Sequence, residues 1–180
     1  SLFLQDICRH MTVRAATADD VEVIKQVARR SWETDYPDIL TRETVEAGIG
    51  DWYALDSLTT ALARERTSLL VAEPESSVVG FVHAVRQAAT GVGFVLRLYV
   101  DPDHRREGVG AALLDAVAEA LSGDGLERID AAVLSANGLG RTFYESFGFE
   151  LADEAETRIG GESYPECRYS LSADALVGYT

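Results

Sequence analysis

The spacing of apolar side chains changes several times along the 180-residue chain, and each change marks a predicted element. Residues 21–32 carry apolar side chains at helical intervals behind a possible N-cap, Thr17, so they predict an amphipathic helix. The dipeptide Tyr36-Pro37 is expected to end this helix, because proline lacks the N–H that a helix requires. The other elements expected in this part of the chain are a strand at 12–16 and helices at 41–47 and 51–66.

After residue 66 the pattern changes to the alternation that is typical of strands. Three strands are predicted at 68–73, 78–86 and 92–100, and Asp101-Pro102 ends the last of them. Helical spacing then returns, followed by a strand, a second helix and two final strands. These elements are predicted at 108–121, 129–134, 139–147 and on either side of Gly160-Gly161.

This order of elements predicts a mixed α/β (α+β) sheet, because it lacks the regular βαβ alternation of a doubly wound fold. No internal repeat and no Gly/Ser/Pro-rich linker divides the chain. We therefore assign residues 12–180 to a single domain and residues 1–11 to an N-terminal arm. A domain of this length can bury a core without disulfides or a structural metal.

The chain is strongly acidic, with 30 acidic and 16 basic residues and a formal net charge of −14. Lys25 is its single lysine. Such a charge repels phosphate backbones and argues against nucleic-acid binding. The composition has two interpretations that the sequence does not separate. One is a halophilic source, where salt screens the acidic groups, and the other is a GC-rich genome that encodes arginine in place of lysine.

Other sequence features bear on the compartment. Cys8 and Cys167 lie far apart, with no CxxC pair and no neighbouring histidine, so neither a zinc site nor a disulfide framework is expected. No apolar run approaches the length of a membrane span, and the first ten residues lack the apolar segment of a signal peptide. We expect a cytoplasmic protein without a metal and without a membrane partner.

One turn carries chemistry that the sequence can identify, the glycine turn before the helix predicted from Gly108. Gly108 and Gly110 remove Cβ atoms at the start of a helix, where unpaired N–H groups and the helix dipole attract anions. His104, Arg105 and Arg106 form the densest cationic cluster of this acidic chain. The glycines alone would also suit an ordinary turn, but with this cluster they predict a small ligand that carries several phosphates.

The spacing of this turn excludes two common phosphate loops. A Walker A loop requires a lysine, and a Rossmann fingerprint requires a third glycine where Leu113 stands. The pattern R-x-x-G-x-G of residues 105–110, shortly after the V-x-P of residues 100–102, resembles the acyl-CoA loop of the GCN5-related N-acetyltransferases (GNAT superfamily). The pattern N-x6-Y-x2-F-G-F of residues 137–149 resembles the second motif of that superfamily, and the element order from 12 to 171 is similar to its fold.

The resemblance implies a GNAT-like, mostly antiparallel sheet flanked by helices, with a V-shaped splay between the strands at 92–100 and 129–134. Acetyl-CoA is the implied cosubstrate, and the splay would hold its pantetheine arm. Asn137 would orient that arm, and Tyr144 would donate a proton to the departing thiolate, which a phenol at hydrogen-bond distance can do. The residues implied to bind the cofactor are Leu98, Tyr99, Val100, Arg105, Arg106, Glu107, Gly108, Val109, Gly110, Ala111, Asn137 and Tyr144.

The chain departs from the superfamily pattern at the general base. Many members carry a glutamate on one of two central strands, at positions that align with Leu96 and Ala132, and both residues are apolar here. The stretch W-E-T-D-Y-P resembles the loop that lines the acceptor pocket, so Glu33 and Asp35 are the candidate bases. The candidate acceptor contacts are Trp32, Tyr36 and Tyr164.

Several of these side chains also have a structural interpretation. Asn137 suits the N-cap of the helix that follows it, and Tyr144 lies at helical spacing for a core position. Arg97 either pairs with an acid across strands or attracts an anionic acceptor. Tyr164 either flanks the acceptor pocket or packs on the last hairpin, and His83 is expected to be an ordinary strand residue.

The sequence thus predicts an enzyme that transfers the acetyl group of acetyl-CoA to a primary amine by direct attack. The acceptor is a small-molecule amine, an amino acid, an antibiotic, or the N-terminus or a lysine of a peptide, and the expected assembly is a monomer or a homodimer. The alternative is an acyl-CoA-binding sensor or regulatory module without turnover. The apolar Leu96 and Ala132 favour that alternative, and Tyr144 argues against it.

Overall fold

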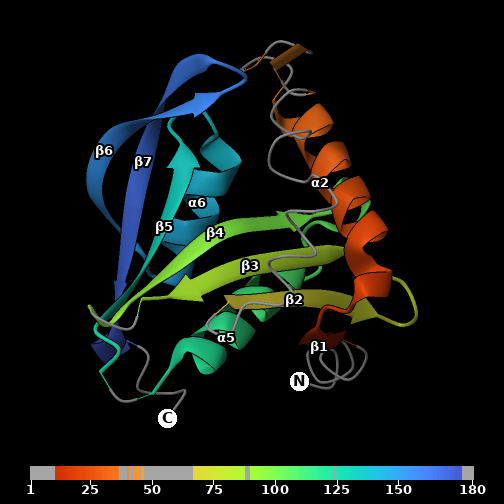
Figure 1. Cartoon of the computed structure of the whole chain (residues 1–180), viewed down its shortest axis with the longest axis horizontal. Helices are drawn as coiled ribbons and strands as arrows, with labels where there is room; N and C mark the ends of the chain where they lie inside the picture. The colour runs from red at the N-terminus through yellow and green to blue at the C-terminus, as the bar shows by residue number, and fades with distance from the viewer. Residues whose placement is uncertain are drawn as a thin grey trace.

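One seven-stranded sheet with helices on both faces makes up the fold (Figure 1). The structure is a computed structural model that describes residues 11–36, 40, 43, 44, 46, 67–87, 90–123 and 125–175. The strands are β1 (Met11–Ala15), β2 (Thr67–Pro74), β3 (Gly80–Arg86), β4 (Val92–Val100), β5 (Arg128–Leu134), β6 (Glu150–Ile159) and β7 (Glu162–Ser172). The helices are α2 (Val21–Asp35), α5 (Val109–Leu121) and α6 (Gly138–Phe147), with short 3-10 helices η1 (Ala18–Asp20) and η2 (Pro102–His104).

The strands follow the order β1-β2-β3-β4-β5-β7-β6, and β4–β5 is the one parallel pair among these described strands. Parallel pairing of β4 with β5 starts at Val92 and Arg128 and ends at Val95 and Ala131. Beyond these residues the two strands diverge, and β5, β7 and β6 rise away from the other half of the sheet (Figure 1). The predicted mixed, mostly antiparallel sheet with a splay is confirmed.

A β-bulge in β4 lies where the strands part. His83 of β3 lies opposite Arg97, whereas the next residue, Ala84, lies opposite Val95. Leu96 is therefore the extra residue of the bulge, and its side chain is 48% exposed. A bulge bends its strand and increases the local twist, which directs the second half of β4 away from β5.

Two apolar cores lie on opposite faces of the sheet. Alternation along a strand turns neighbouring residues to opposite faces, so Phe81 packs into the core under α2 and Val82 into the core under α5 and α6. Trp32 of α2 and Leu113 of α5 are fully buried in these two cores, and burial of such a side chain contributes about 2 kcal/mol. The helices thereby hold the two halves of the sheet on either side of the splay.

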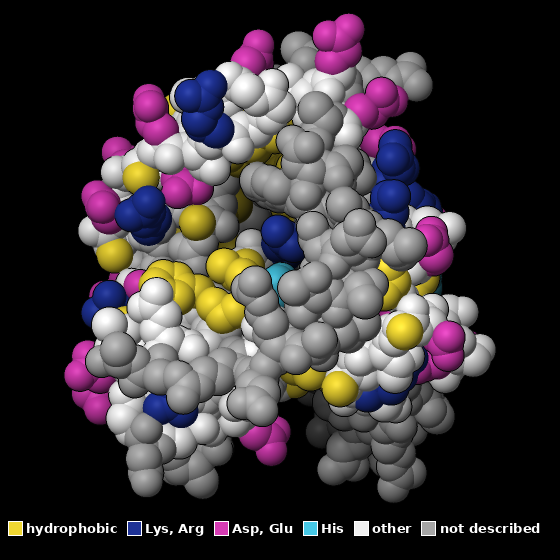
Figure 2. Space-filling view, in the orientation of Figure 1, with side chains coloured by type: hydrophobic (Ala, Val, Ile, Leu, Met, Phe, Trp, Pro, Cys, Tyr) yellow, Lys and Arg dark blue, Asp and Glu magenta, His cyan; other side chains and the backbone are white. Residues whose placement is uncertain are grey.

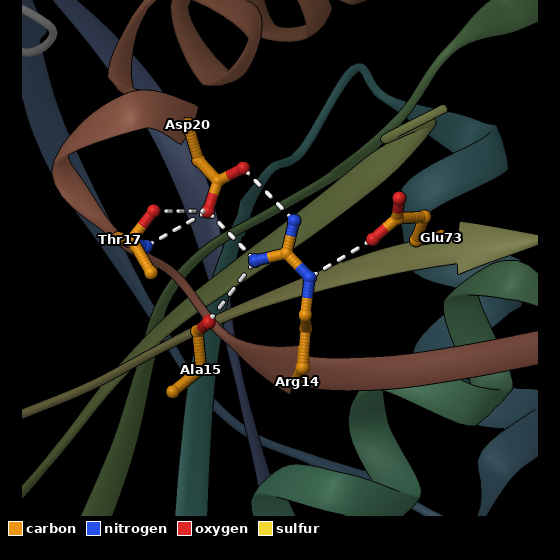
Figure 3. Close-up of polar contacts among 5 residues, drawn as sticks. All are labelled: Arg14, Ala15, Thr17, Asp20 and Glu73. Atoms are coloured by element: carbon orange, nitrogen blue, oxygen red, sulfur yellow. Dashed lines mark hydrogen bonds and ion pairs between the residues drawn. The ribbon is translucent and has the colours of Figure 1, made fainter. Parts of the chain in front are cut away.

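Arg14 ties β1 to the start of the first helical segment (Figure 3). Its guanidinium donates to both carboxylate oxygens of Asp20, at 2.8 and 3.0 Å, and to Glu73 of β2 at 2.9 Å. Asp20 also accepts the backbone N–H of Thr17 at 2.8 Å, which satisfies a free donor at the helix start. The hydrogen bond from Arg14 is the main cause that lowers the pKa of Asp20.

The predicted elements that fall on described residues are present, with ends shifted by at most three residues. The 3-10 helix η2 was not predicted, and β1 begins at Met11, a residue assigned to the arm. Residues 1–10 and the helix predicted at 51–66 lie outside the described residues, and of the helix at 41–47 only residues 43, 44 and 46 are described. Within the described part of the chain, no helix is long and apolar enough to cross a membrane.

Candidate active site

A cavity of about 680 Å³ opens where β4 and β5 part. Its walls include residues 96–100 of β4 and 132–134 of β5, which directly follow the last paired residues of the two strands. On the face of the molecule shown in Figure 2, hydrophobic side chains and a basic side chain surround a hollow. The residues that complete the lining come from α2, the glycine turn, α5, α6, β6 and β7: Ser31, Trp32, Asp35, Tyr36, His104, Arg105, Arg106, Gly108, Val109, Gly110, Ala111, Asn137, Leu139, Gly140, Phe143, Tyr144, Thr157, Ile159 and Glu166.

The cavity passes through the sheet from one face to the other. Val109 and Tyr144 belong to the core under α5 and α6, whereas Tyr36 and Ile159 belong to the core under α2. All four residues line the same cavity, so two ligands can enter it from opposite faces and meet in the gap. We call the two sides the turn face, where α5 begins, and the α2 face.

The glycine turn presents free backbone donors to the turn face. Arg106 and Gly108 adopt left-handed backbone conformations, with φ of 65° and 81°, and α5 begins at Val109. Ala112 donates the first helical hydrogen bond, to the carbonyl of Gly108 at 3.0 Å, so the N–H groups of residues 109–111 precede the helical ladder. A Cβ atom at Gly108 would meet nothing within 4 Å, which leaves open space at this helix start. Free N–H groups, the helix dipole and open space are together suited to bind an anion.

Gly110 lines the cavity and also allows two helices to pack closely. A Cβ atom at this position would lie 3.0 Å from the ring of Phe143 on α6. The Phe143 ring in turn contacts the Tyr144 ring, with centroids 5.2 Å apart. The two predicted loop glycines therefore differ, because Gly108 leaves room at the helix start and Gly110 lets α6 approach α5.

Arg105 is engaged within the protein, which changes its predicted role as a cofactor contact. Its guanidinium donates to both oxygens of Asp35, at 2.5 and 2.7 Å, and to the hydroxyl of Ser31 at 3.1 Å. Arg30 of α2 in turn donates to two carboxylates beside the glycine turn. They are Asp101 and Asp103 of η2, each at 2.7 Å. Two arginines thus tie the glycine turn to α2, and we call this pair of contacts the arginine clamp.

The rest of the predicted cationic cluster lies near the rim of the cavity. Arg106 is exposed and lines the cavity, so its side chain can reach an anion at the helix start. His104 lies beside Glu107, with Nδ1 and a carboxylate oxygen 3.2 Å apart. Glu107 does not belong to the lining of the cavity.

Neither predicted base has the geometry of a free carboxylate in the cavity. Glu33 is exposed, lies 4.0 Å from Arg29 on the same helix and does not line the cavity. Asp35 lines the cavity, but Arg105 and Ser31 occupy its oxygens. The structure therefore removes Glu33 from the site and makes Asp35 part of the clamp.

Asn137 and Tyr144 lie where the second motif predicted them, at the wall of the cavity. The Asn137 side chain accepts the N–H of Gly140 at 3.0 Å and so caps α6. It also lies near the buried hydroxyl of Tyr36 and partly offsets the rise in the pKa of that phenol. Tyr144 is buried, and its ring stacks on Tyr169 with centroids 6.2 Å apart.

The protonation state of Tyr144 follows from its burial. Removal from water raises the pKa of its phenol above the ordinary value, and the nearby Tyr99 hydroxyl adds to the effect. The same cause, burial, raises the pKa of Tyr36. Both phenols are therefore neutral at physiological pH and can donate a proton inside the cavity.

The α2 face of the cavity carries predicted and unpredicted residues. Trp32 and Tyr36 line it as predicted, with ring centroids 5.2 Å apart, whereas Tyr164 lies outside the lining and donates to Glu162 at 2.7 Å. Arg97 also lines the cavity. The sequence had left open whether this side chain pairs across strands or faces the acceptor. Glu166 was missed, although alternation along β7 gave a signal. Cys167, Tyr169 and Leu171 are buried on one face, so Glu166, one residue before Cys167, faces the other side.

Comparison with known proteins identifies the family. Residues 65–151 match the family model described as an acetyltransferase (GNAT) domain, and this segment holds both the glycine turn and Tyr144. The chain is also 27% identical to a spermidine N(1)-acetyltransferase of Thermoplasma acidophilum over 145 residues, which is 78% of this chain and 89% of that protein. Residues 65–151 therefore match the GNAT superfamily.

Solved structures agree with this GNAT assignment. The PaiA N-acetyltransferase of T. acidophilum, in complex with coenzyme A, superposes with a TM-score of 0.78 at 25% identity, covering 90% of this chain and 98% of that one. A GCN5-related N-acetyltransferase from Rhodopseudomonas palustris shares the fold, with a TM-score of 0.76 at 21% identity over 89% and 94% of the two chains. The predicted superfamily and fold are confirmed.

Proposed function

We propose that this GNAT protein transfers the acetyl group of acetyl-CoA to a primary amine, by direct attack of the amine on the thioester. The observation that carries the proposal is the cavity through the gap between β4 and β5. It joins free N–H donors at the start of α5 to the buried phenol of Tyr144. A phosphate-bearing thioester and an amine can therefore meet inside the sheet, away from bulk water.

The turn face suits coenzyme A. The N–H groups of residues 109–111 point their partial positive charge to open space beside Gly108, where a pyrophosphate would be held. Residues 98–100 of β4 line the gap beyond the last pair with β5, so backbone groups on that edge can bind the amides of a pantetheine arm. The PaiA structure with coenzyme A supports this assignment.

Tyr144 acts as the general acid in this proposal. A departing thiolate is the anion of a group whose pKa is about 8.5, and it needs a proton from a nearby donor. Because burial raises the pKa of the Tyr144 phenol, this side chain carries a proton at neutral pH. A β4 backbone N–H beside the gap would stabilise the negative charge that develops on the thioester oxygen.

The acceptor is proposed to be a small cationic amine, and spermidine is the first compound to test. Similarity to the spermidine N(1)-acetyltransferase supports this choice. The aromatic rings of Trp32 and Tyr36 on the α2 face suit the methylene chain of a polyamine and can bind its cationic groups. The formal net charge of −14 attracts cations, although salt screens the attraction.

The release of free thiol from acetyl-CoA across a panel of amines tests the proposal and separates it from the sensor alternative. The panel contains polyamines, amino acids, aminoglycosides and peptides, each at low and high KCl. We expect rapid release with at least one amine, matched by a mass increase of one acetyl group on that amine. Tight coenzyme A binding without thiol release above background for any amine would instead support the sensor.

A further inference from the structure

The described residues place two carboxylates in the lining of the cavity, Asp35 and Glu166. Asp35 is held by Arg105, which contacts both of its oxygens, and by the hydroxyl of Ser31 at 3.3 Å. A carboxylate in this arrangement is a structural anchor with little capacity to bind a second cation. Glu166 is the carboxylate that remains.

Glu166 keeps an oxygen available to a ligand. It lies on β7 opposite Leu134, the last residue of β5, and its side chain is 14% exposed. Its contact is with Arg168, whose Nε lies 3.5 Å from Oε1 and whose side chain is 54% exposed. Among the described residues, no donor contacts the second oxygen, Oε2.

The position of Glu166 is on the α2 face. Its neighbour Cys167 is buried in the core under α5 and α6, and alternation along β7 turns Glu166 to the opposite face. Ala132, the nearby strand position that is apolar in this chain, lies opposite Arg168 and also lines the cavity. Glu166 of β7 therefore lies near Ala132 of β5, the position where other members of the superfamily carry a glutamate.

We propose that Glu166 is the catalytic residue that receives the ammonium group of the acceptor and takes its proton. This inference rests on the proposed function. An aliphatic amine has a pKa near 10, so at neutral pH its nitrogen carries an extra proton and has no free electron pair for attack. A half-buried carboxylate in the cavity attracts that ammonium group and serves as its base.

The proton and electron balance of the step is as follows. Glu166 takes one proton from the ammonium group and releases it to solvent. The nitrogen electron pair then forms the C–N bond with the thioester carbonyl carbon, and the C–S bond breaks with its electron pair on sulfur. The thiolate gains one proton from Tyr144, and the second proton that the attacking nitrogen loses restores the Tyr144 phenol. The products are the acetylated amine, the free thiol and one solvent proton.

Glu166→Gln tests the proposal, with Glu154→Gln as the matched control. Glu154 is an exposed glutamate of β6 that lies outside the cavity lining. Its variant removes the same negative charge as Glu166→Gln, but away from the site. For the ammonium acceptor found in the panel, kcat/KM of Glu166→Gln should fall by about 100-fold or more, which is the range for loss of a general base. The KM of Glu166→Gln for acetyl-CoA should stay within about twofold of the wild-type value, because the change does not touch the turn face. The kcat/KM of the control variant should also stay within about twofold of the wild-type value.

A second acceptor separates a base from a structural residue. For an amine whose pKa lies below the assay pH, the nitrogen is already neutral, so the loss in Glu166→Gln should shrink to a few-fold. Glu166→Asp keeps a carboxylate and should recover part of the rate with the ammonium acceptor. Equal losses with both amines, or no loss with either, would overturn the proposal for Glu166. If the wild-type protein releases no thiol above background with any amine of the panel, the proposed function is refuted instead.

Discussion

Replacement of Arg105 and Asp35, singly and together, tests whether the arginine clamp holds the glycine turn. The Arg105 half of the clamp consists of hydrogen bonds to Asp35 at 2.5 and 2.7 Å and to Ser31 at 3.1 Å. The two charged side chains are 28% and 14% exposed, so water screens their attraction only in part. Hydrogen bonds to charged groups of this kind contribute about 1.5–3 kcal/mol to stability.

We expect Arg105→Met and Asp35→Asn each to lower the free energy of unfolding by about 2 kcal/mol, since each leaves one partner partly buried without its contact. The double variant should lose less than the sum of the two, by about 1–2 kcal/mol, because both single changes remove the same interaction. Each single variant should also bind coenzyme A several-fold more weakly, because the turn that bears the free N–H groups is then held less firmly to α2.

Urea unfolding and calorimetric titration of coenzyme A measure these effects. The control is Arg29→Met, at an arginine of α2 whose side chain is 43% exposed. A direct contact between Arg105 and a phosphate makes the opposite prediction for Asp35→Asn, which would free Arg105 and strengthen binding. Tighter binding by Asp35→Asn, or losses of stability that add in the double variant, would refute the clamp.

Three further predictions follow from single residues. Tyr144→Phe should lower kcat by about 100-fold or more while the KM for acetyl-CoA stays within about twofold, and an unchanged kcat would exclude Tyr144 as the acid. Gly110→Ala should lower Tm by a few degrees in thermal unfolding, because its methyl group would lie 3.0 Å from the ring of Phe143 and overpacking costs about 1–3 kcal/mol; an unchanged Tm would contradict the contact. The pKa of Asp20 is lowered by Arg14, so this pair stabilises the fold above the ordinary carboxylate pKa of about 4 and loses that contribution as pH falls through the lower folded value. Asp20→Asn should therefore make the free energy of unfolding less sensitive to pH below about pH 4, and an unaltered acid profile would argue against the pair.

Local sequence patterns were sufficient to predict much of the fold and to mark the glycine turn as a candidate anion site. Strand β4 was predicted with its observed limits, because Val92–Val100 is an apolar run bounded by a glycine and by Asp101-Pro102. Gly108 was found because a left-handed helix start and an anion site both favour glycine, a local requirement. Tyr144 became a candidate acid through the resemblance of residues 137–149 to the second GNAT motif, and that role stays a prediction.

Contacts between distant segments could not be predicted in the same way. Arg105 and Asp35 are 70 residues apart, and the charge of Arg105 suited a phosphate as well as a carboxylate. The bulge at Leu96 depends on the register of β3 against β4, which no local pattern reports. Glu166 became a candidate only when the sheet placed its face of β7 against the cavity.

The central claim is that the start of α5 holds the phosphates of coenzyme A, and Ala111 offers the most direct measurement. Ala111 is exposed, belongs to the first turn of α5 and lines the cavity. A glutamate there should not destabilise the helix, because acidic residues favour a helix start, but it would place a negative charge in the anion site. Ala111→Gln has nearly the same shape without that charge.

Calorimetric titration of coenzyme A into the two Ala111 variants therefore isolates the effect of charge at this helix start. We predict that Ala111→Glu binds at least about 10-fold more weakly than Ala111→Gln at low salt, and that high KCl narrows the difference. Equal affinities of the two variants at low salt would contradict the phosphate site at α5.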